Sequence, residues 1–152
     1  MKIIIFSFVT FIAIISGCSK TSTTVDSQNF KLTDFSFDKK NVMNQGKYIN
    51  MFSNSELSVD SKLSKPGNYK LTIRAKGSTV EKGWPKFDLL VNGKKVGESG
   101  VDSSEFSDKT FNLNLETSEN KITIKFTNDA FNAKTKEDRN LYIESMKLDL
   151  VN

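Results

Sequence analysis

Apolar side chains recur at every second position over most of the chain after residue 29, and this period limits the fold more than any other feature. Ile122, Ile124 and Phe126 alternate with polar residues. The same spacing occurs in residues 69–75, 87–91 and 111–115. Successive side chains of a β-strand point to opposite faces, so these runs predict strands with one buried face. No long segment has the 3.6-residue apolar period of a helix, so the chain is predicted to be all-β.

Turn signals separate the predicted strands. Asn92-Gly93 lies between two apolar runs and predicts a two-residue hairpin. Residues 66–68 and 118–120 mark two further turns. In the last strand the apolar positions change from odd to even numbers after Ile143, which predicts a β-bulge near Glu144. Earlier strands are expected at residues 30–37, 47–52 and 56–59.

The number of strands indicates the architecture. Eight or nine short antiparallel strands within one domain imply two packed sheets. We therefore predict an antiparallel two-sheet β-sandwich of the jelly-roll type over residues 30–152, although periodicity alone does not separate a sandwich from a closed barrel.

The N-terminus reads as a targeting segment. An apolar run from Ile3 to Ile15 follows Lys2 and ends in Ser16-Gly17-Cys18, which resembles the lipobox of bacterial lipoproteins. The run is shorter than the roughly 20 residues that a membrane span needs. We expect a signal peptide at residues 1–17, then a lipidated Cys18 and a flexible polar tether at residues 18–29. An ordinary secretory signal with an incidental cysteine is the alternative.

This resemblance implies a protein of the bacterial cell envelope, anchored by lipid such as palmitate to the outer membrane or cell surface. Ser19 after the cysteine lacks the aspartate that retains some lipoproteins at the inner membrane. The membrane is then a partner through the anchor, and the folded domain is expected to be a monomer.

Composition excludes several classes of function. The chain has no histidine and one cysteine, so histidine-dependent triads and zinc sites are excluded. The formal net charge of +4 is mild and lacks long basic blocks, which argues against nucleic acid binding. Oxygen ligands remain, and these suit calcium. A carboxylate pair can catalyse glycoside hydrolysis, but no such pair stands out, and no catalytic residue is predicted.

Oxygen-bearing residues gather between two predicted strands, in residues 128–140. This segment holds Asp129, Glu137 and Asp138, and the amides of Asn128 and Asn140 add further oxygens. Both ends of the segment join strands, which can hold these oxygens together around a calcium ion. The spacing is not that of an EF-hand. A solvated polar loop is the alternative reading of the composition.

The order of residues adds a resemblance. Phe-Thr-Asn-Asp at 126–129, a polar loop, and Asp-Arg-Asn-Leu-Tyr-Ile at 138–143 resemble the calcium-dependent xylan-binding carbohydrate-binding modules. A strand ending in Ala-Lys-Gly at 75–77 and a strand with an Asn-Gly hairpin at 84–96 also resemble that family. The resemblance covers residues 69–148, about half of the chain.

What the resemblance implies is a calcium ion on loops at one edge of a sandwich, in contact with sugar hydroxyls. Asp129 and Asp138 would be its leading ligands, with Asn128 and Asn140 as further ones. Asp138 and Arg139 would also contact carbohydrate. Glu144 stands where the family often has aspartate, and the loop lysines also depart from the family pattern. These departures argue against assuming that xylan itself is the ligand.

Two aromatic residues lie in or near these loops. Trp84, the only tryptophan, is a candidate for stacking on a sugar ring, or it covers one end of the core. Phe131 is expected to tuck under its own loop, and Tyr142 is expected to be a half-buried strand residue.

Three functions follow in order of preference. The first is a lipid-anchored, non-catalytic protein that binds a glycan, xylan-like or other, through calcium. The second is a surface lipoprotein with the same fold that acts as an adhesin or as an envelope or protein-interaction module. The third is a glycosidase.

Overall fold

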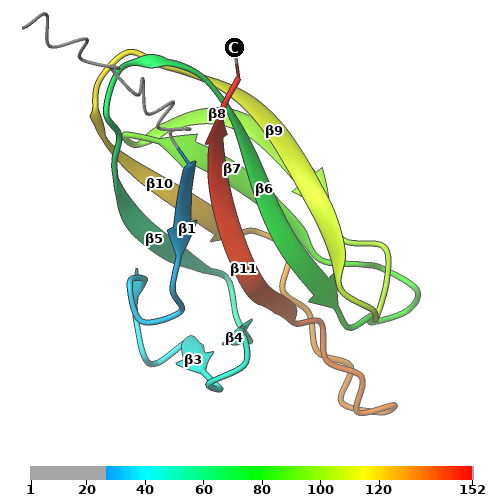
Figure 1. Cartoon of the computed structure of the whole chain (residues 1–152). Coiled ribbons are helices and arrows are strands. Elements are labelled where there is room, and N and C mark those ends of the chain that lie inside the picture. Colours follow the sequence, from blue (N-terminus) through cyan, green and yellow to red (C-terminus); the bar gives the residue numbers. More distant parts are fainter. Residues whose placement is uncertain (1–26, 152) are drawn as a thin grey trace, which may run out of the picture.

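The computed structural model describes residues 27–151 as an antiparallel β-sandwich (Figure 1). The predicted signal peptide, Cys18 and the first part of the predicted tether lie outside the described residues. One sheet has the strand order β3-β4-β11-β6-β9, with β1 also paired to β11, and the other has the order β2-β5-β10-β7-β8. The two-sheet sandwich predicted from the alternation is confirmed. The described part of the chain contains no helix that could span a membrane.

The strand bounds place most of the chain in these two sheets. The six-stranded sheet comprises β1 (Ser27–Phe30), β3 (Val42–Asn44), β4 (Ile49–Met51), β6 (Gly67–Gly77), β9 (Ser107–Leu115) and β11 (Leu141–Leu150). The five-stranded sheet comprises β2 (Ser36–Phe37), β5 (Ser55–Lys62), β7 (Lys86–Val91), β8 (Lys94–Gly100) and β10 (Glu119–Phe126).

The core lies between the sheets and follows the predicted alternation. Tyr69, Leu71 and Ile73 on β6 are fully buried. They belong to the same cluster as Ile122 and Ile124 on β10 of the other sheet. Burial of such side chains contributes about 1.5–3 kcal/mol each. The interior is therefore built from the alternate residues that the sequence marked as apolar.

Strand β11 connects the two ends of the molecule. Its first residues, Leu141–Ile143, pair with β4, and its last residues pair with β1 through Ser27 and Asp149. The register shifts between Ile143 and Ser145, which confirms the predicted bulge and keeps both halves of the strand facing the core.

Two expectations near the N-terminus are wrong. The strand expected at residues 30–37 is interrupted by a turn, in which the backbone N–H of Lys31 donates to Asp34 Oδ2 at 2.8 Å. Strand β1 begins at Ser27, so residues 27–29, which are predicted to be part of the tether, belong instead to the folded domain. They pair with the end of β11, and this pairing supplies backbone partners that the polar sequence does not reveal.

Candidate functional site

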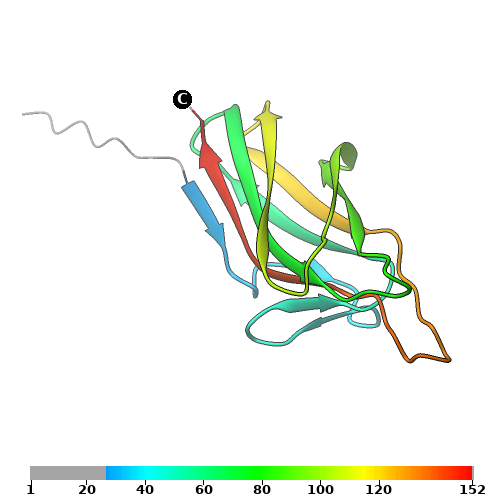
Figure 2. The same cartoon turned by 90° about the vertical axis from the view of Figure 1, so that its right-hand side faces the viewer.

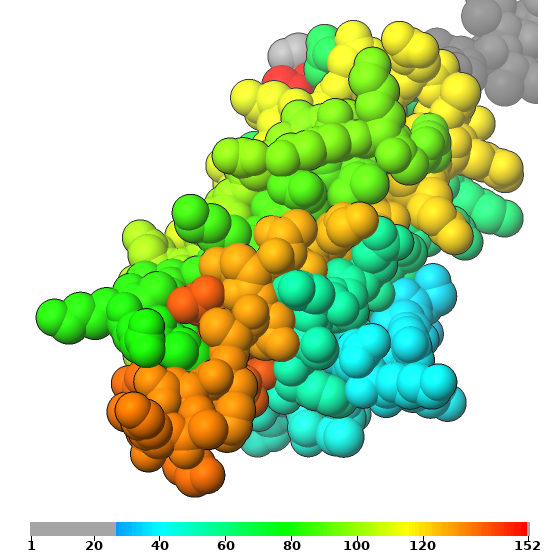
Figure 3. Space-filling view, turned by 180° about the vertical axis from the view of Figure 1, so that it is seen from behind, coloured from blue at the N-terminus to red at the C-terminus, as the bar shows by residue number. Residues whose placement is uncertain are grey.

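Three connecting segments meet at one end of the sandwich: residues 52–54, 78–85 and 127–140. The longest extends beyond the sheets (Figure 2), and from behind it lies beside the 78–85 segment (Figure 3). These segments follow β4, β6 and β10, whose ends lie together because β4 and β6 both pair with β11. The fold therefore gathers loops from both sheets around the predicted site.

The 127–140 segment folds back on itself as a hairpin. Phe131 and Asp138 form an antiparallel bridge, and the N–H of Arg139 donates to the carbonyl of Ala130 at 2.9 Å. The side chain of Asn132 closes the tip by accepting from the N–H groups of Lys134 and Thr135. Because its two legs run antiparallel, Asp129 and Asp138, nine positions apart in sequence, come close enough to interact electrostatically.

Asp129 lies on the first leg, against the segment after β4. Its backbone N–H donates to Asn54 Oδ1 at 2.8 Å, and Ser53 hydrogen-bonds to its carboxylate. Its Oδ1 is buried and has no hydrogen-bond partner. Burial and then the negative charge of Asp138 raise the pKa of Asp129, while hydrogen bonds from the backbone of Ala130 and from Ser53, and the charge of Arg139, act in the opposite direction.

Asp138 and Asn140 lie on the second leg and are held by Ser78. The Ser78 hydroxyl donates to the carbonyl of Asp138 and accepts from the N–H of Asn140 at 2.9 Å. Asn140 Nδ2 donates to Asp138 Oδ2 at 3.1 Å. The other end of that amide, Oδ1, is buried and has no partner. Ser53, Asn54 and Ser78 belong to no recognisable motif, so no sequence signal indicates their roles.

Two unpaired buried acceptors are an unusual feature of so small a site. Four side-chain atoms of this kind occur in residues 27–151, and two of them are Asp129 Oδ1 and Asn140 Oδ1. A buried acceptor without a donor costs about 1–3 kcal/mol, and coordination to a cation satisfies an oxygen of this kind. Among the described residues, no three or more acidic, histidine or cysteine side chains are grouped so that they could hold a metal ion by themselves. A calcium ion here would need further oxygens from backbone carbonyls, water or a ligand.

Asn128 has a different environment from the other predicted ligands. Its Oδ1 accepts from the N–H of Lys86 at 2.6 Å, and its Nδ2 donates to the carbonyl of Trp84 at 3.0 Å. Both ends of the amide thus join the end of β10 to the start of β7. In this structure the side chain of Asn128 positions the loop and does not point to the two unpaired acceptors.

Arg139, a predicted sugar contact, holds backbone carbonyls from two loops. Nε donates to Gly83 at 2.9 Å, Nη1 to Asn128 at 2.8 Å and Nη2 to Val80 at 3.0 Å. A Cβ atom added to Gly83 would collide with this guanidinium, so glycine permits the close approach. The arrangement fixes the 78–85 loop to the hairpin.

The two loop aromatics differ in exposure. Phe131 is 61% exposed at the hairpin, so the expectation that it tucks under its own loop is wrong. It lines a cleft of about 500 Å³ together with Val80, Glu81, Ala130 and Arg139. Trp84 is partly buried, and Tyr142 is half-buried as expected. Of the two loop aromatics, Phe131 therefore offers a more accessible ring than Trp84 beside Asp129 and Asp138.

Comparison with protein families decides which class the domain falls into. Residues 70–152 match carbohydrate-binding module family 60, described as calcium-dependent and xylan-binding. The chain belongs to this family. The match includes the 78–85 and 127–140 segments of the site. It does not include residues 52–54, the segment after β4 that contains Asn54. No curated protein matches the chain.

Solved structures resemble the CBM60 domain in fold. One is the CBM36-1 domain of a multidomain xylanase from the hindgut metagenome of Trinervitermes trinervoides, with 16% identity, a TM-score of 0.66, and coverage of 84% of this chain and 99% of that chain. Another is a family 35 module from Clostridium thermocellum, with 15% identity, a TM-score of 0.63, and coverage of 82% and 98%. A CBM36 module in complex with calcium and xylotriose has 15% identity, a TM-score of 0.62, and coverage of 82% and 99%. At these identities the likeness concerns the sandwich fold.

Proposed function

We propose that this CBM60 chain is a lipid-anchored, non-catalytic protein that binds a xylan-like glycan through calcium held by Asp129, Asp138 and Asn140. The observation that carries the proposal is the pair of buried, unpaired oxygens, Asp129 Oδ1 and Asn140 Oδ1, beside the Asp138 carboxylate. Their chemistry matches the oxygen-only preference of calcium. The description of the family as calcium-dependent and xylan-binding supports the same assignment.

The chain's own residues prepare this site before any ligand arrives. Asn140 and Ser78 fix the orientation of Asp138, and Asn54 fixes the backbone at Asp129. Arg139 fastens the neighbouring loop, which keeps the cleft open beside the acidic pair. Calcium, when bound, supplies positive charge and coordination positions that sugar hydroxyls can fill. Such preorganisation limits the ordering cost of binding.

The exposed ring of Phe131 supplies a stacking surface for a sugar in the adjoining cleft. Trp84 is partly buried, and its backbone carbonyl accepts from Asn128 Nδ2, so Phe131 is the aromatic residue assigned to stacking in this proposal. Binding then combines ion coordination with contact to one aromatic face.

The proposed anchor places this site away from a membrane. Ser27 pairs with Asp149 near the end of β11, whereas the site precedes Leu141 at the start of that strand. A ten-residue strand is about 30 Å long. A lipid on Cys18 would attach near the far end, so the loops would face outward from the envelope. The test is replacement of Cys18 with serine, which should move the protein from the detergent phase to the aqueous phase; unchanged partitioning would remove the anchor from the proposal.

Calorimetric titration with xylohexaose tests the binding function. Heat of binding is expected with calcium and is expected to vanish in EDTA and in Asp138→Asn. Asp60→Asn is the matched control, because Asp60 is an exposed aspartate on β5 outside the site, and it should bind normally. If neither the parent chain nor Asp60→Asn bound xylohexaose in calcium, the adhesin or protein-interaction alternative would be favoured.

A further inference from the structure

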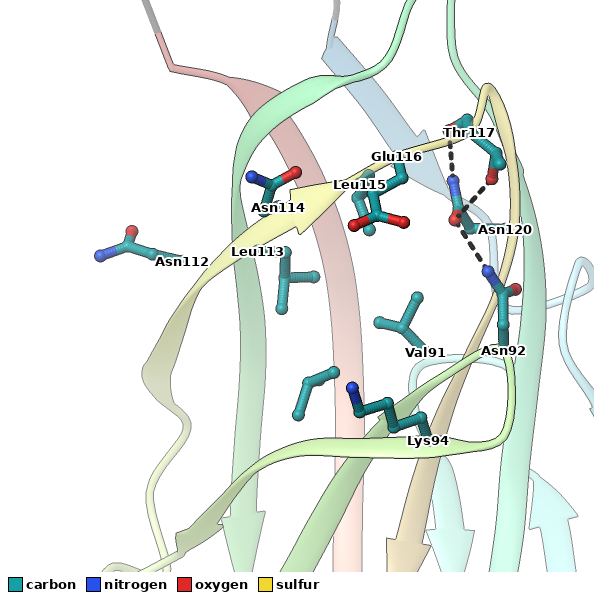
Figure 4. Close-up of a pocket in the computed structure, with 11 residues that line it drawn as sticks. Val91, Asn92, Lys94, Asn112, Leu113, Asn114, Leu115, Glu116, Thr117 and Asn120 are labelled. Atoms are coloured by element: carbon teal, nitrogen blue, oxygen red, sulfur yellow. Dashed lines mark hydrogen bonds between the residues drawn. The ribbon is translucent and has the colours of Figure 1, made fainter.

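Two clefts flank strand β9 on the side of the sandwich where both sheets end. Strand β9 is hydrogen-bonded only to β6, and β8 only to β7, among the strands described. The cleft between β8 and β9 has a volume of about 410 Å³ (Figure 4). A second cleft of about 310 Å³ lies toward β6 and includes Asn68 and Val151. Asn112, Leu113 and Asn114 line both clefts, so this part of β9 forms a ridge between them.

The ridge carries amide side chains that have no partner within the described residues. Asn112 and Asn114 alternate with the buried Leu113 and are exposed on the outer face of β9. Asn68 is also exposed and lies directly across from Asn114 in the β6–β9 register. Each amide group offers two N–H donors and one carbonyl acceptor without a net charge. Hydroxyl groups of a sugar have the complementary donors and acceptors.

The larger cleft has an apolar floor and a fixed wall. Leu113 and Val91 line it, and Val96 is 46% exposed there. On one side, Asn92 Nδ2 donates to Asn120 Oδ1 at 3.0 Å, and that oxygen also accepts from Thr117 Oγ1 at 3.1 Å. These bonds hold the ends of β7 and β10 together, so the cleft is formed before a ligand binds.

Two charged side chains of opposite sign line the same cleft. Figure 4 shows Glu116 from the end of β9 and Lys94 from β8 extending toward its middle from different strands. No ion pair joins them among the salt bridges of the described residues. Glu116 can accept and Lys94 can donate a hydrogen bond, while their charges compensate. The cleft therefore favours a neutral, hydroxyl-rich ligand with an apolar face.

We propose that the β9 ridge and its two clefts form a second glycan-binding site, which takes a neutral oligosaccharide without calcium. It lies toward the opposite end of the sheet from the acidic hairpin: Leu113 pairs with Tyr69, whereas Gly77, at the other end of β6, pairs with Leu141. A chain with both sites would bind polysaccharide with avidity beyond that of either site alone. The inference rests on the proposed function only in that the domain recognises glycans.

Nuclear magnetic resonance of the full ¹⁵N-labelled chain in EDTA tests this site. The probes are xylohexaose, cellohexaose and mannohexaose. At least one should cause saturable shifts of the backbone amides of Lys94, Asn112 and Asn114. The double variant Asn112→Ala/Asn114→Ala should lose these shifts, whereas Asp138→Asn should retain them. Thr110→Ala, an exposed change on the same face of β9, is the matched control and should also retain them.

Three results would overturn the second site. The first is that none of the three sugars shifts the amide signals of the ridge. The second is that the shifts persist unchanged in the double variant. The third is that only an extended Thr-Val peptide causes shifts, which would show that β9 binds peptides as an open strand edge. Adding calcium to the same samples tests the hairpin separately, because calcium binding there should shift the backbone amide signals of Asp129 and Asp138. Failure of the calcium site and failure of the ridge are therefore distinguishable.

Discussion

Asn140 donates from Nδ2 to Asp138 Oδ2 at 3.1 Å, while its own Oδ1 is buried and accepts no hydrogen bond. The amide thus fixes one carboxylate and leaves an oxygen free beside it. Asn140 is only 9% exposed, so water has little access to that oxygen. Asp129 Oδ1 is likewise buried without a hydrogen-bond partner, and these two unpaired oxygens are the physical basis for the calcium proposal.

The raised pKa of Asp129 predicts a dependence of stability on pH in the absence of calcium. Its causes are burial, then the charge of Asp138. A carboxyl with a folded pKa above its unfolded value binds more protons when folded, so its contribution destabilises the fold as pH rises from the unfolded to the folded pKa. Asp129→Asn should therefore stabilise the calcium-free protein at pH 7. The check is the difference in unfolding free energy between variant and parent, measured by urea titration from pH 3 to pH 7.

That difference should grow with pH and level off above the folded pKa of Asp129. Comparison with the variant is needed because Asp102 and Asp149 have lowered pKa values, through Lys109 and Lys147 respectively. Their contribution has the opposite sign, since it is lost as pH falls. A difference that does not change with pH would show that the Asp129 carboxylate is not perturbed.

Removal of Arg139 should loosen the site as a whole. Arg139→Ala leaves the carbonyls of Val80, Gly83 and Asn128 without their donor. Hydrogen bonds to charged groups contribute roughly 1.5–3 kcal/mol each, and water can replace part of this, so a loss of about 2–4 kcal/mol is expected. Arg139→Lys should recover only part, because an ammonium lacks the planar fork. Thermal denaturation measures both, and a loss below about 0.5 kcal/mol for the alanine variant would contradict the clamp.

Adjacent residues of β10 should both matter, for different reasons. Ile124→Ala should cost about 2–5 kcal/mol because it leaves a cavity in the core. Thr123 faces the other way but is only 6% exposed, and its Oγ1 shares a 2.8 Å hydrogen bond with Ser58 Oγ. Thr123→Ala should cost about 1 kcal/mol. In a urea-monitored double-mutant cycle, Ser58→Ala should add little to Thr123→Ala, whereas full additivity would mean that the hydroxyls do not interact.

The exposed loop aromatic should affect binding without affecting stability. Phe131→Ala should weaken binding of xylohexaose in calcium about tenfold, because a sugar loses its stacking surface. Phe131→Tyr should retain most of the affinity. The calcium response of the melting temperature should stay unchanged in both. Equal affinity of the alanine variant and the parent in calorimetry would remove Phe131 from the binding surface.

Elements defined by local sequence were the predictable part of the fold. Asn92 and Gly93 both have positive φ angles, 51° and 79°, as the Asn-Gly turn requires. The bulge after Ile143 was predictable because the apolar positions change from odd to even numbers there, and one extra residue in the strand is needed to keep them on the same face. The strand over residues 30–37 was misjudged because Asp34 stabilises a turn through Lys31, a local competition that the apolar pattern does not record.

The sequence supplied candidate residues for the site but not their contacts. The order of residues in the loop made Asp129 and Asp138 candidate calcium ligands, and that role stays a prediction. The contributions of Asn54 and Ser78 depend on segments distant in sequence, which only the sheet topology brings together. The direction of Arg139 likewise depends on the 78–85 loop, so the sequence could not show that it faces backbone carbonyls.

The melting temperature as a function of calcium concentration tests the central claim most directly. Calcium that binds the folded state stabilises it by about 2.7 kcal/mol at 100 times the dissociation constant, a rise of roughly 10 °C for a domain of this size. The parent and Asp60→Asn should show this rise, reversible with EDTA, and Asp138→Asn should not. An absence of any rise at millimolar calcium in the parent, or an equal rise in Asp138→Asn, would contradict a calcium site at Asp129, Asp138 and Asn140.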